Sequence, residues 1–359
     1  MTDISDLRRL AAPKVPPFAV PTWIRPVPMP AGTHGLAGGW ASFDLVDIVQ
    51  RDDAGYSVSR ATPDALLSMA DDRNCAVAAL DRLAAPRPDW AGLPLDRPAI
   101  MGILNVTPDS FSDGGRHNAP ARAVAAGRAM IDAGAAIVDI GGESTRPGAA
   151  PVTRNQELAR VLPPIAGLKG AGIRLSIDTR HAEVMTRATA AGADIINDVN
   201  GLRGEGALDA AAGSGAAVAI MHMQGTPETM QADPRYGFAP VEIYEFLEER
   251  IASAEAAGIP RARIAIDPGF GFGKSVAHNL SLIGWTAMFH GLGVPILIGA
   301  SRKSSIASLS AGEPADQRLA GSLTLAMATV AQGCQLLRVH DVAETRQALA
   351  VQMALAASI

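Results

Sequence analysis

Short apolar runs, each ending in a polar residue, recur along the chain from about residue 98 onward. A run of this kind is typical of a strand that is buried on both faces and opens into a loop at its carboxyl end. Eight such runs are present, at 99–105, 136–142, 173–178, 194–198, 217–223, 263–268, 295–301 and 336–341.

Alanine-rich segments with helical character separate the runs, at 120–133, 154–168, 182–191, 207–212, 241–257, 277–290, 315–332 and 342–357. Gly134, Gly192, Gly258 and Gly333 stand where helix C-caps are expected. Eight strand–helix units over roughly 250 residues predict a (β/α)8 TIM barrel. A doubly wound open sheet is the alternative, but no G-x-G-x-x-G sequence follows the first strand.

The first 95 residues have a different pattern, so we divide the chain into an N-terminal extension (1–95) and a barrel (96–359). Dense proline between Pro13 and Pro30 predicts an extended arm. Runs at 43–49 and 56–59 flank the sequence RDDAG and predict a hairpin. Thr62 followed by Pro63 predicts a helix start, with the helix reaching about Leu83, and a linker follows. The extension carries no chemical motif, which predicts an accessory role.

Polar residues at the strand ends are expected to meet at one rim, because the active sites of such barrels lie at the carboxyl ends of the strands. Arg338 and His340 are two positions apart and share one side of their strand, as do Ser176 and Asp178. The strand-end residues are Asn105, Asp139, Asp178, Asn197, His222, Asp267, Ser301 with Lys303, and Arg338 with His340.

These side chains divide into two chemical groups. Asp178, Asn197 and Asp267 supply acceptors and an amide, which suit a flat heterocycle with several adjacent N–H groups, and Lys303 can donate to the same ring. The second group supplies cations and donors for a phosphate or pyrophosphate and contains Asn105, Thr145, Arg146, Arg338 and His340. No acidic metal cage is present, so a Mg²⁺ held by one or two protein oxygens and by phosphate oxygens fits best.

Two loops are predicted to cover this rim, at about 106–116 and 142–153. The first loop mixes hydroxyls and carboxylates around the aromatic Phe111 and ends in Gly114 and Gly115, which is typical of a lid over a polar ligand. The glycine-rich sequence 267–274 ends in Lys274 but lacks phosphate-loop spacing, so its glycines are expected to let the backbone approach a flat ligand.

Composition narrows the class further. The chain has 359 residues, is 48% hydrophobic and 19% charged, and is therefore globular. A net charge of −5 argues against a general nucleic-acid surface. Two cysteines form no disulfide framework, and the chain has neither a signal-peptide pattern nor a membrane-length apolar stretch. We expect a cytoplasmic protein with no membrane or nucleic-acid partner.

The ordered motifs resemble those of the dihydropteroate synthase family. They are NVTPDSFSDGG (105–115), DIGGESTRPG (139–148), SIDT (176–179), INDV (196–199), MHMQGTP (221–227), DPGFGFGK (267–274), SRKS (301–304) and RVHDV (338–342). The resemblance covers the chain from about Pro98 to the end. It implies a (β/α)8 barrel that joins 6-hydroxymethyl-7,8-dihydropterin pyrophosphate to p-aminobenzoate, releasing pyrophosphate, and that is a target of sulfonamides.

The resemblance also implies roles for individual residues. Asn105 matches the Mg²⁺ ligand, and His340 matches a pyrophosphate contact. The pterin site is matched by Asp178, Asn197, Met221, Asp267, Lys303 and Arg338. Met221 read alone would be a core residue. Asn105, Lys303, Arg338 and His340 are the expected catalytic residues. The p-aminobenzoate and pyrophosphate sites are matched by Phe111, Thr145, Arg146, Pro147, Phe272 and Ser301.

The implied partners are two small-molecule substrates and a second copy of the chain, paired through the last helices. The implied reaction is a dissociative loss of pyrophosphate that needs no covalent enzyme intermediate. We expect Arg338→Ala to lower turnover far more than stability. The alternatives are a pterin-dependent methyltransferase on the same barrel and a pterin-binding protein without catalysis. The methyltransferase would have no use for the SRKS and RVH groups.

Overall fold

The eight expected strands form a single parallel sheet. A computed structural model describes residues 7–106, 119–143 and 152–358. The sheet order is β11-β10-β9-β8-β7-β6-β13-β12, and a bridge between Ile266 and Ile296 brings its two ends together. The sheet is therefore closed into a barrel. Its strands are β6 (Ala99–Asn105), β7 (Ile137–Gly141), β8 (Arg174–Asp178), β9 (Ile195–Asp198), β10 (Ala217–Met221), β11 (Ile264–Asp267), β12 (Leu297–Ile298) and β13 (Leu336–Val339).

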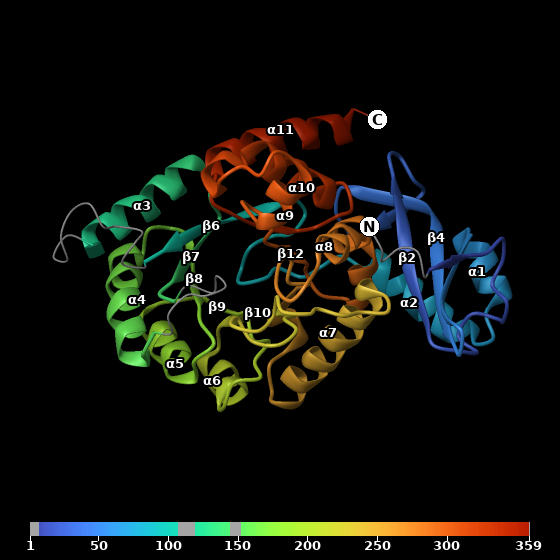
Figure 1. Cartoon of the computed structure of the whole chain (residues 1–359), viewed down its shortest axis with the longest axis horizontal. Coiled ribbons are helices and arrows are strands. Elements are labelled where there is room, and N and C mark those ends of the chain that lie inside the picture. The colour runs from blue at the N-terminus through green and yellow to red at the C-terminus, as the bar shows by residue number, and fades with distance from the viewer. Residues whose placement is uncertain (1–6, 107–118, 144–151, 359) are drawn as a thin grey trace.

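Helices surround the sheet and confirm the (β/α)8 architecture (Figure 1). They are α3 (Ala119–Ala133), α4 (Arg154–Leu168), α5 (Ala182–Ala191), α6 (Ala207–Ser214), α7 (Ala239–Ala256), α8 (Val276–Gly284), α9 (Ser304–Leu309), α10 (Leu319–Val330) and α11 (Val342–Ala357). Short 3₁₀ turns are η2 (Arg261–Arg263), η3 (Thr286–Leu292) and η4 (Ala315–Gln317). Two predicted helices, 277–290 and 315–332, are each divided into a 3₁₀ turn and an α-helix.

Local sequence explains where several helices begin and end. Thr153 and Gln156 form a reciprocal capping box at the start of α4, so the first backbone N–H groups have partners. Ser275 and His278 do the same for α8. Helix α5 ends at Gly192, whose φ of 128° is unfavourable for a residue with a Cβ.

Alternation along the strands separates the helix-facing core from the barrel interior. Leu175 and Ile177 pack in the main apolar core between sheet and helices, whereas Ser176 is buried inside the barrel. At the amino-terminal end, the interior is filled by a separate apolar cluster that includes Trp90 and Leu95. Trp90 is fully buried and donates its indole N–H to the carbonyl of Arg263 at 3.0 Å. The segment predicted as a linker therefore plugs the barrel.

The N-terminal region forms a sheet with two helices rather than an extended arm. The strand order is β1-β5-β4-β2, and β3 also pairs with β4. Its elements are β1 (Arg8–Arg9), β2 (Thr22–Met29), β3 (His34–Leu36), β4 (Ala41–Asp52), β5 (Gly55–Ala61), α1 (Pro63–Met69) and α2 (Arg73–Ala84). We call residues 8–84 the N-terminal unit.

The N-terminal unit agrees with the sequence prediction in its hairpin and differs from it in the arm and the helix. The β4–β5 hairpin is confirmed. The extended arm is wrong, because residues 22–29 pair antiparallel with β4 across a bulge that accommodates two prolines. The helix predicted from Thr62 to about Leu83 begins as expected but is interrupted at Ala70, and the Asp72 side chain caps a second helix by accepting from two backbone N–H groups.

The N-terminal sheet is enclosed on both faces. Ile24 and Ile48 pack with α1 and α2, whereas Trp23 and Val49 belong to the core that continues into the barrel. The unit contacts the barrel mainly at η3 and lies beside α7 and α8 (Figure 1). Within the part of the chain that the structure describes, no helix is long and apolar enough to cross a membrane.

Candidate active site

The predicted polar strand ends converge at the carboxyl end of the barrel. Arg338 on β13 donates through Nε to Asp139 on β7 at 2.6 Å and through Nη2 to Asp178 on β8 at 2.6 Å. Asn197 on β9 donates its amide to Asp139 at 3.2 Å. Four different strands thus contribute to one buried polar network. The sequence shows which polar residues end the strands, but not which of their side chains bond to one another.

The electrostatics of this network are strongly coupled. Burial raises the pKa of Asp178 to about 7, against the opposing effect of the Arg338 guanidinium. Burial alone would lower the pKa of Arg338, but the carboxylates of Asp139 and Asp178 outweigh it and raise that pKa. One oxygen of Asp139 and the hydroxyl of Ser176 are buried without a hydrogen-bond partner among the described residues. Such groups are available to a polar ligand.

Asp267 ends β11 on the other side of Arg338. One carboxylate oxygen accepts from the Gly269 N–H at 2.7 Å. Burial raises the pKa of Asp267, while that N–H and the cations of Lys303 and Arg338 oppose the rise. A Cβ on Gly299 would lie 3.8 Å from the carboxylate and 3.7 Å from Cβ of Arg338. The absence of a side chain at that position therefore leaves Asp267 and Arg338 open to the same space.

An apolar wall lies beside these carboxylates. Met221 and Phe272 belong to one buried cluster with Val199, Met223 and Met230. Lys303 lies with Nζ 3.9 Å from the centroid of the Phe272 ring, a cation–π contact. A flat ring bound against Met221 would lie close to Asp267, because these two residues pair across β10 and β11.

Ser301 and His340 form a pair next to Lys303. The Ser301 hydroxyl is 3.0 Å from His340 Nδ1 and accepts from the His340 backbone N–H at 3.2 Å. Burial, followed by the neighbouring Arg302 and Arg338 cations, lowers the pKa of His340 to about 4. The imidazole is therefore neutral near pH 7, so it acts as a hydrogen-bonding group rather than as a cation.

Asn105 supplies an oxygen suited to a hard cation. A Cβ on Gly141 would lie 3.6 Å from both the Asn105 amide oxygen and a carboxylate oxygen of Asp178, so the glycine lets these groups approach each other. Among residues 7–106, 119–143 and 152–358, no three His, Cys, Asp or Glu residues are placed to hold a metal ion. An oxygen donor set this sparse fits a Mg²⁺ that takes most of its ligands from phosphate oxygens and water.

The predicted site residues Phe111, Thr145, Arg146 and Pro147 lie outside the described residues. The residue just before the second loop is well defined: Glu143 accepts two hydrogen bonds from Arg180, each at 3.0 Å. Glu157 on α4 is buried nearby, and burial raises its pKa to about 7.

Sequence reasoning did not assign two features of the site. The sequence placed Asp139 at a strand end but gave it no role. Asp139 lies two positions before Gly141 and therefore faces the barrel interior, as Gly141 does. Lys274 lies buried under the glycine-rich loop, where it donates to the Phe272 carbonyl at 2.9 Å and lies 2.9 Å from His222 Nδ1. Burial lowers the pKa values of both Lys274 and His222. No sequence signal gives this pairing, because it joins two different loops.

Comparison with known proteins accounts for the barrel. A family model described as pterin binding enzyme matches residues 101–340. The dihydropteroate synthase of Escherichia coli (strain K12) is 48% identical over 260 residues, which are 72% of this chain and 92% of that protein.

Solved structures give the same result. The dihydropteroate synthase of Xanthomonas albilineans with 4-aminobenzoic acid is 50% identical, has a TM-score of 0.71, and covers 75% of this chain and 98% of its own. A structure of dihydropteroate synthase from the same organism in complex with 7,8-dihydropteroate is 45% identical, with a TM-score of 0.67 over 76% of this chain and 98% of its own. The chain belongs to the pterin binding enzyme family.

Proposed function

We propose that this protein is a dihydropteroate synthase, a transferase that joins 6-hydroxymethyl-7,8-dihydropterin pyrophosphate to p-aminobenzoate in folate biosynthesis. The observation that carries the proposal is the juxtaposition of two chemistries at one rim. An acceptor-rich cluster of side chains suited to a heterocycle lies against cations suited to pyrophosphate, in a chain whose relatives have been solved with 4-aminobenzoic acid and with 7,8-dihydropteroate.

The pterin would bind with its amino-amide edge toward Asp178, Asn197 and Asp267. A carboxylate that accepts from two adjacent N–H groups of a guanidine-like edge forms strong charge-assisted hydrogen bonds. Met221 would contact one ring face, and Lys303 would donate to a ring acceptor. Burial raises the pKa of Asp267 because water is excluded from its carboxylate. Ring N–H groups that donate to the carboxylate would take the place of that water and favour the charged form.

The pyrophosphate would lie on the cationic side of the pocket. Arg338 and Lys303 supply positive charge, and the neutral His340 can donate one N–H. Asn105 would hold a Mg²⁺, which supplies charge neutralisation to the leaving group when it is bound. Thr145, Arg146 and Pro147 of the second loop, and Phe111 of the first, are proposed to complete this side and the p-aminobenzoate pocket on the strength of the family resemblance.

The reaction follows from these positions. The bond between the pterin methylene carbon and the pyrophosphate oxygen breaks first, and Arg338 and Lys303 stabilise the charge that develops on the leaving oxygens. The arylamine nitrogen of p-aminobenzoate, placed by Phe272 and Ser301, then attacks the methylene carbon and loses one proton to solvent. Catalysis by this route depends on positioning and electrostatics, so a covalent enzyme nucleophile has no role.

A coupled assay tests the proposal. With Mg²⁺ and dihydropterin pyrophosphate present, the protein is expected to release pyrophosphate only when p-aminobenzoate is added, in step with dihydropteroate formation. Asn105→Ala is expected to raise the Mg²⁺ concentration needed for half-maximal rate. Pterin binding without pyrophosphate release would favour a methyltransferase or a binding protein and would contradict the roles given to Lys303, Arg338 and His340.

We also propose a cytoplasmic homodimer. Leu280, Leu309, Val351 and Leu355 lie on α8, α9 and α11 and are among the most exposed large apolar side chains of the described chain. Their exposure supports pairing through the last helices. Sedimentation velocity is expected to give the mass of two chains, and Val351→Glu with Leu355→Glu is expected to shift it to one. Cys75 and Cys334 are unpaired, as a reducing compartment would require.

A further inference from the structure

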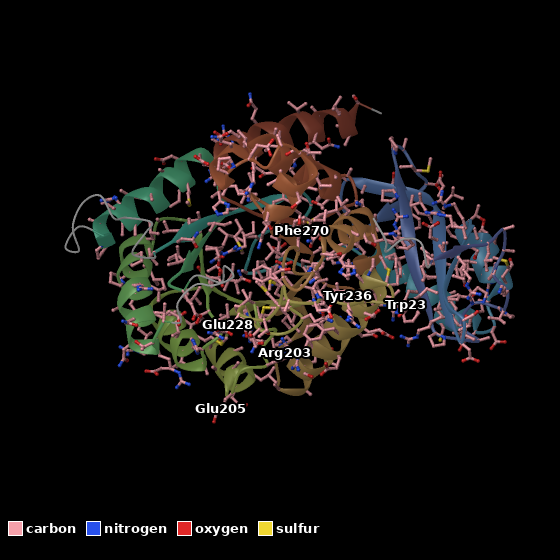
Figure 2. All side chains as sticks on the ribbon, in the orientation of Figure 1. Trp23, Arg203, Glu205, Glu228, Tyr236 and Phe270 are labelled. Carbon is pink, nitrogen blue, oxygen red and sulfur yellow. The ribbon has the colours of Figure 1, made fainter. Side chains whose placement is uncertain are left out.

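The N-terminal unit contacts the barrel along an extended interface that includes two distinct parts. At the first, Trp40 donates its indole N–H to the Val330 carbonyl at 2.7 Å, and Arg25 donates to the Gly284 carbonyl at 2.8 Å. At the second, the tip of the β4–β5 hairpin lies on the connection between β10 and α7. Figure 2 labels Trp23 on the N-terminal sheet and Tyr236 on the barrel, near the junction of the two.

The hairpin contact is specific. The Tyr56 and Phe238 rings pack with centroids 5.6 Å apart, and a Cβ on Gly237 would lie 3.4 Å from the Tyr56 ring. Arg51 forms a two-point ion pair with Glu245 on α7, with N–O distances of 2.9 and 3.1 Å. The segment just before α7 is therefore fixed from outside the barrel.

The same segment holds the loop that forms the apolar wall of the site. We call residues 222–238 the support loop and residues 268–275 the glycine loop. The Tyr236 hydroxyl donates to the Gly273 carbonyl at 2.9 Å, and the Gln231 amide donates to the Gly271 carbonyl at 2.9 Å. Two side chains of the support loop thus satisfy carbonyls on either side of Phe272.

The glycine loop has little room to move independently. Gly271 and Gly273 have φ values of 81° and 62°, which only glycine adopts readily. A Cβ on Gly273 would lie 2.6 Å from the Gln224 carbonyl oxygen, so the two loops are in backbone contact. A shift of the support loop would therefore shift Phe272, and with it the cation–π contact to Lys303.

We infer that the N-terminal unit is a positioning element for the active site, and that Tyr56 acts through Phe238 and Tyr236 to place Phe272. This inference rests on the proposed function. The groups proposed to bind the pterin edge, Asp178, Asn197 and Asp267, stand on barrel strands, and of these three only Asp267 bonds to the two loops, through the Gly269 and His222 backbone N–H groups. The effect is therefore selective: it acts on p-aminobenzoate more than on the pterin substrate.

Tyr236→Phe is the first test, because it removes one hydroxyl and keeps the ring that packs against His278. Loss of the hydrogen bond to Gly273 is expected to raise the KM for p-aminobenzoate about three- to tenfold. The KM for dihydropterin pyrophosphate is expected to stay within about twofold of the wild type. A variant that changes both KM values equally overturns the inference.

Tyr56→Ala tests the link to the N-terminal unit in the full-length chain, with Trp40→Ala as the matched control. Both remove a partly buried aromatic side chain from the contact with the barrel. Tyr56→Ala is expected to raise the KM for p-aminobenzoate selectively, and Trp40→Ala is expected to lower thermal stability with both KM values unchanged.

The double variant, Tyr56→Ala with Tyr236→Phe, completes a double-mutant cycle that measures the coupling between the two residues. If both residues act through the same loop, its KM for p-aminobenzoate rises by less than the product of the single effects. A purely multiplicative result, or an equal response to Trp40→Ala, overturns the inference. Failure of the proposed function itself would be visible separately, as a wild-type protein that makes no dihydropteroate.

Discussion

Replacing Arg338 by methionine removes the only cation that the structure places, among the described residues, in hydrogen-bonding contact with both Asp139 and Asp178. Methionine fills much of the same volume, so the change is mainly electrostatic. Asp139 is fully buried and the Asp178 side chain is 13% exposed. Removing one partner of a buried ion pair typically costs about 3–5 kcal/mol, because the remaining charge is left without compensation. We expect a loss of this size in the free energy of unfolding near pH 7.

The loss is expected to depend on pH. The pKa of Asp178 is already raised by burial to about 7 while Arg338 opposes the rise, so removing Arg338 raises it further. The unfolded value is about 3.9. A carboxyl whose pKa is raised by folding loses its stabilising contribution as the pH rises through the folded pKa. In the variant this loss continues to higher pH, so the deficit relative to wild type is larger at about pH 8.5 than at about pH 6.

Urea unfolding at those two pH values measures both effects. Arg302→Met is the matched control, because Arg302 pairs with Asp341 in a partly exposed position and its loss is expected to cost about 1 kcal/mol. Turnover of Arg338→Met is expected to fall about 100-fold or more, measured under conditions where the variant is folded. A deficit below about 1 kcal/mol that does not change with pH would refute the reasoning. The structure thereby changes the expectation from sequence, in which Arg338 mattered for turnover and little for stability.

Three further predictions address other parts of the molecule. Asp267→Asn is expected to weaken pterin binding about 10- to 100-fold by calorimetry, because a charge-assisted acceptor is lost, and unchanged affinity would contradict the proposed site. Glu157→Gln is expected to stabilise the fold by an amount on the order of 3 kcal/mol at about pH 8.5 and to have little effect near pH 5. The reason is that the folded pKa of Glu157, about 7, lies above the unfolded value, so the carboxyl group loses its stabilising contribution as the pH rises. The exposed Glu183→Gln is the control, and an effect of Glu157→Gln that does not change with pH would count against the argument. Arg87→Met is expected to lower the free energy of unfolding by about 2–3 kcal/mol in urea titrations, because three backbone carbonyls, of Arg82, Ala85 and His290, lose their common donor; a neutral result would show that water replaces the guanidinium.

The N-terminal unit shows how composition can mislead. Many prolines between Pro13 and Pro30 predicted an extended arm, but the edge position of β2 tolerates Pro26 and Pro28 because an edge strand does not need every N–H. The linker composition around Trp90 gave no sign that the indole would fill the barrel floor. Both outcomes depend on contacts with residues far away in the chain, which local patterns do not contain.

The sequence by itself determined the barrel, because eight short apolar strands with polar carboxyl ends, alternating with helices, leave few ways to bury their apolar residues. Asp178, Asn197, Asp267 and Arg338 were identified as polar residues at the ends of predicted strands, and the structure brings them together. Only the tertiary structure decided which charges pair. Asp139 and Arg338 are 199 positions apart in the chain, and the pairing of β13 with β6, the last and first barrel strands in chain order, makes them neighbours. The ring contact between Tyr56 and Phe238 was likewise decided only by the tertiary structure. It depends on how the N-terminal unit packs against the barrel, and no local pattern of residues encodes that arrangement.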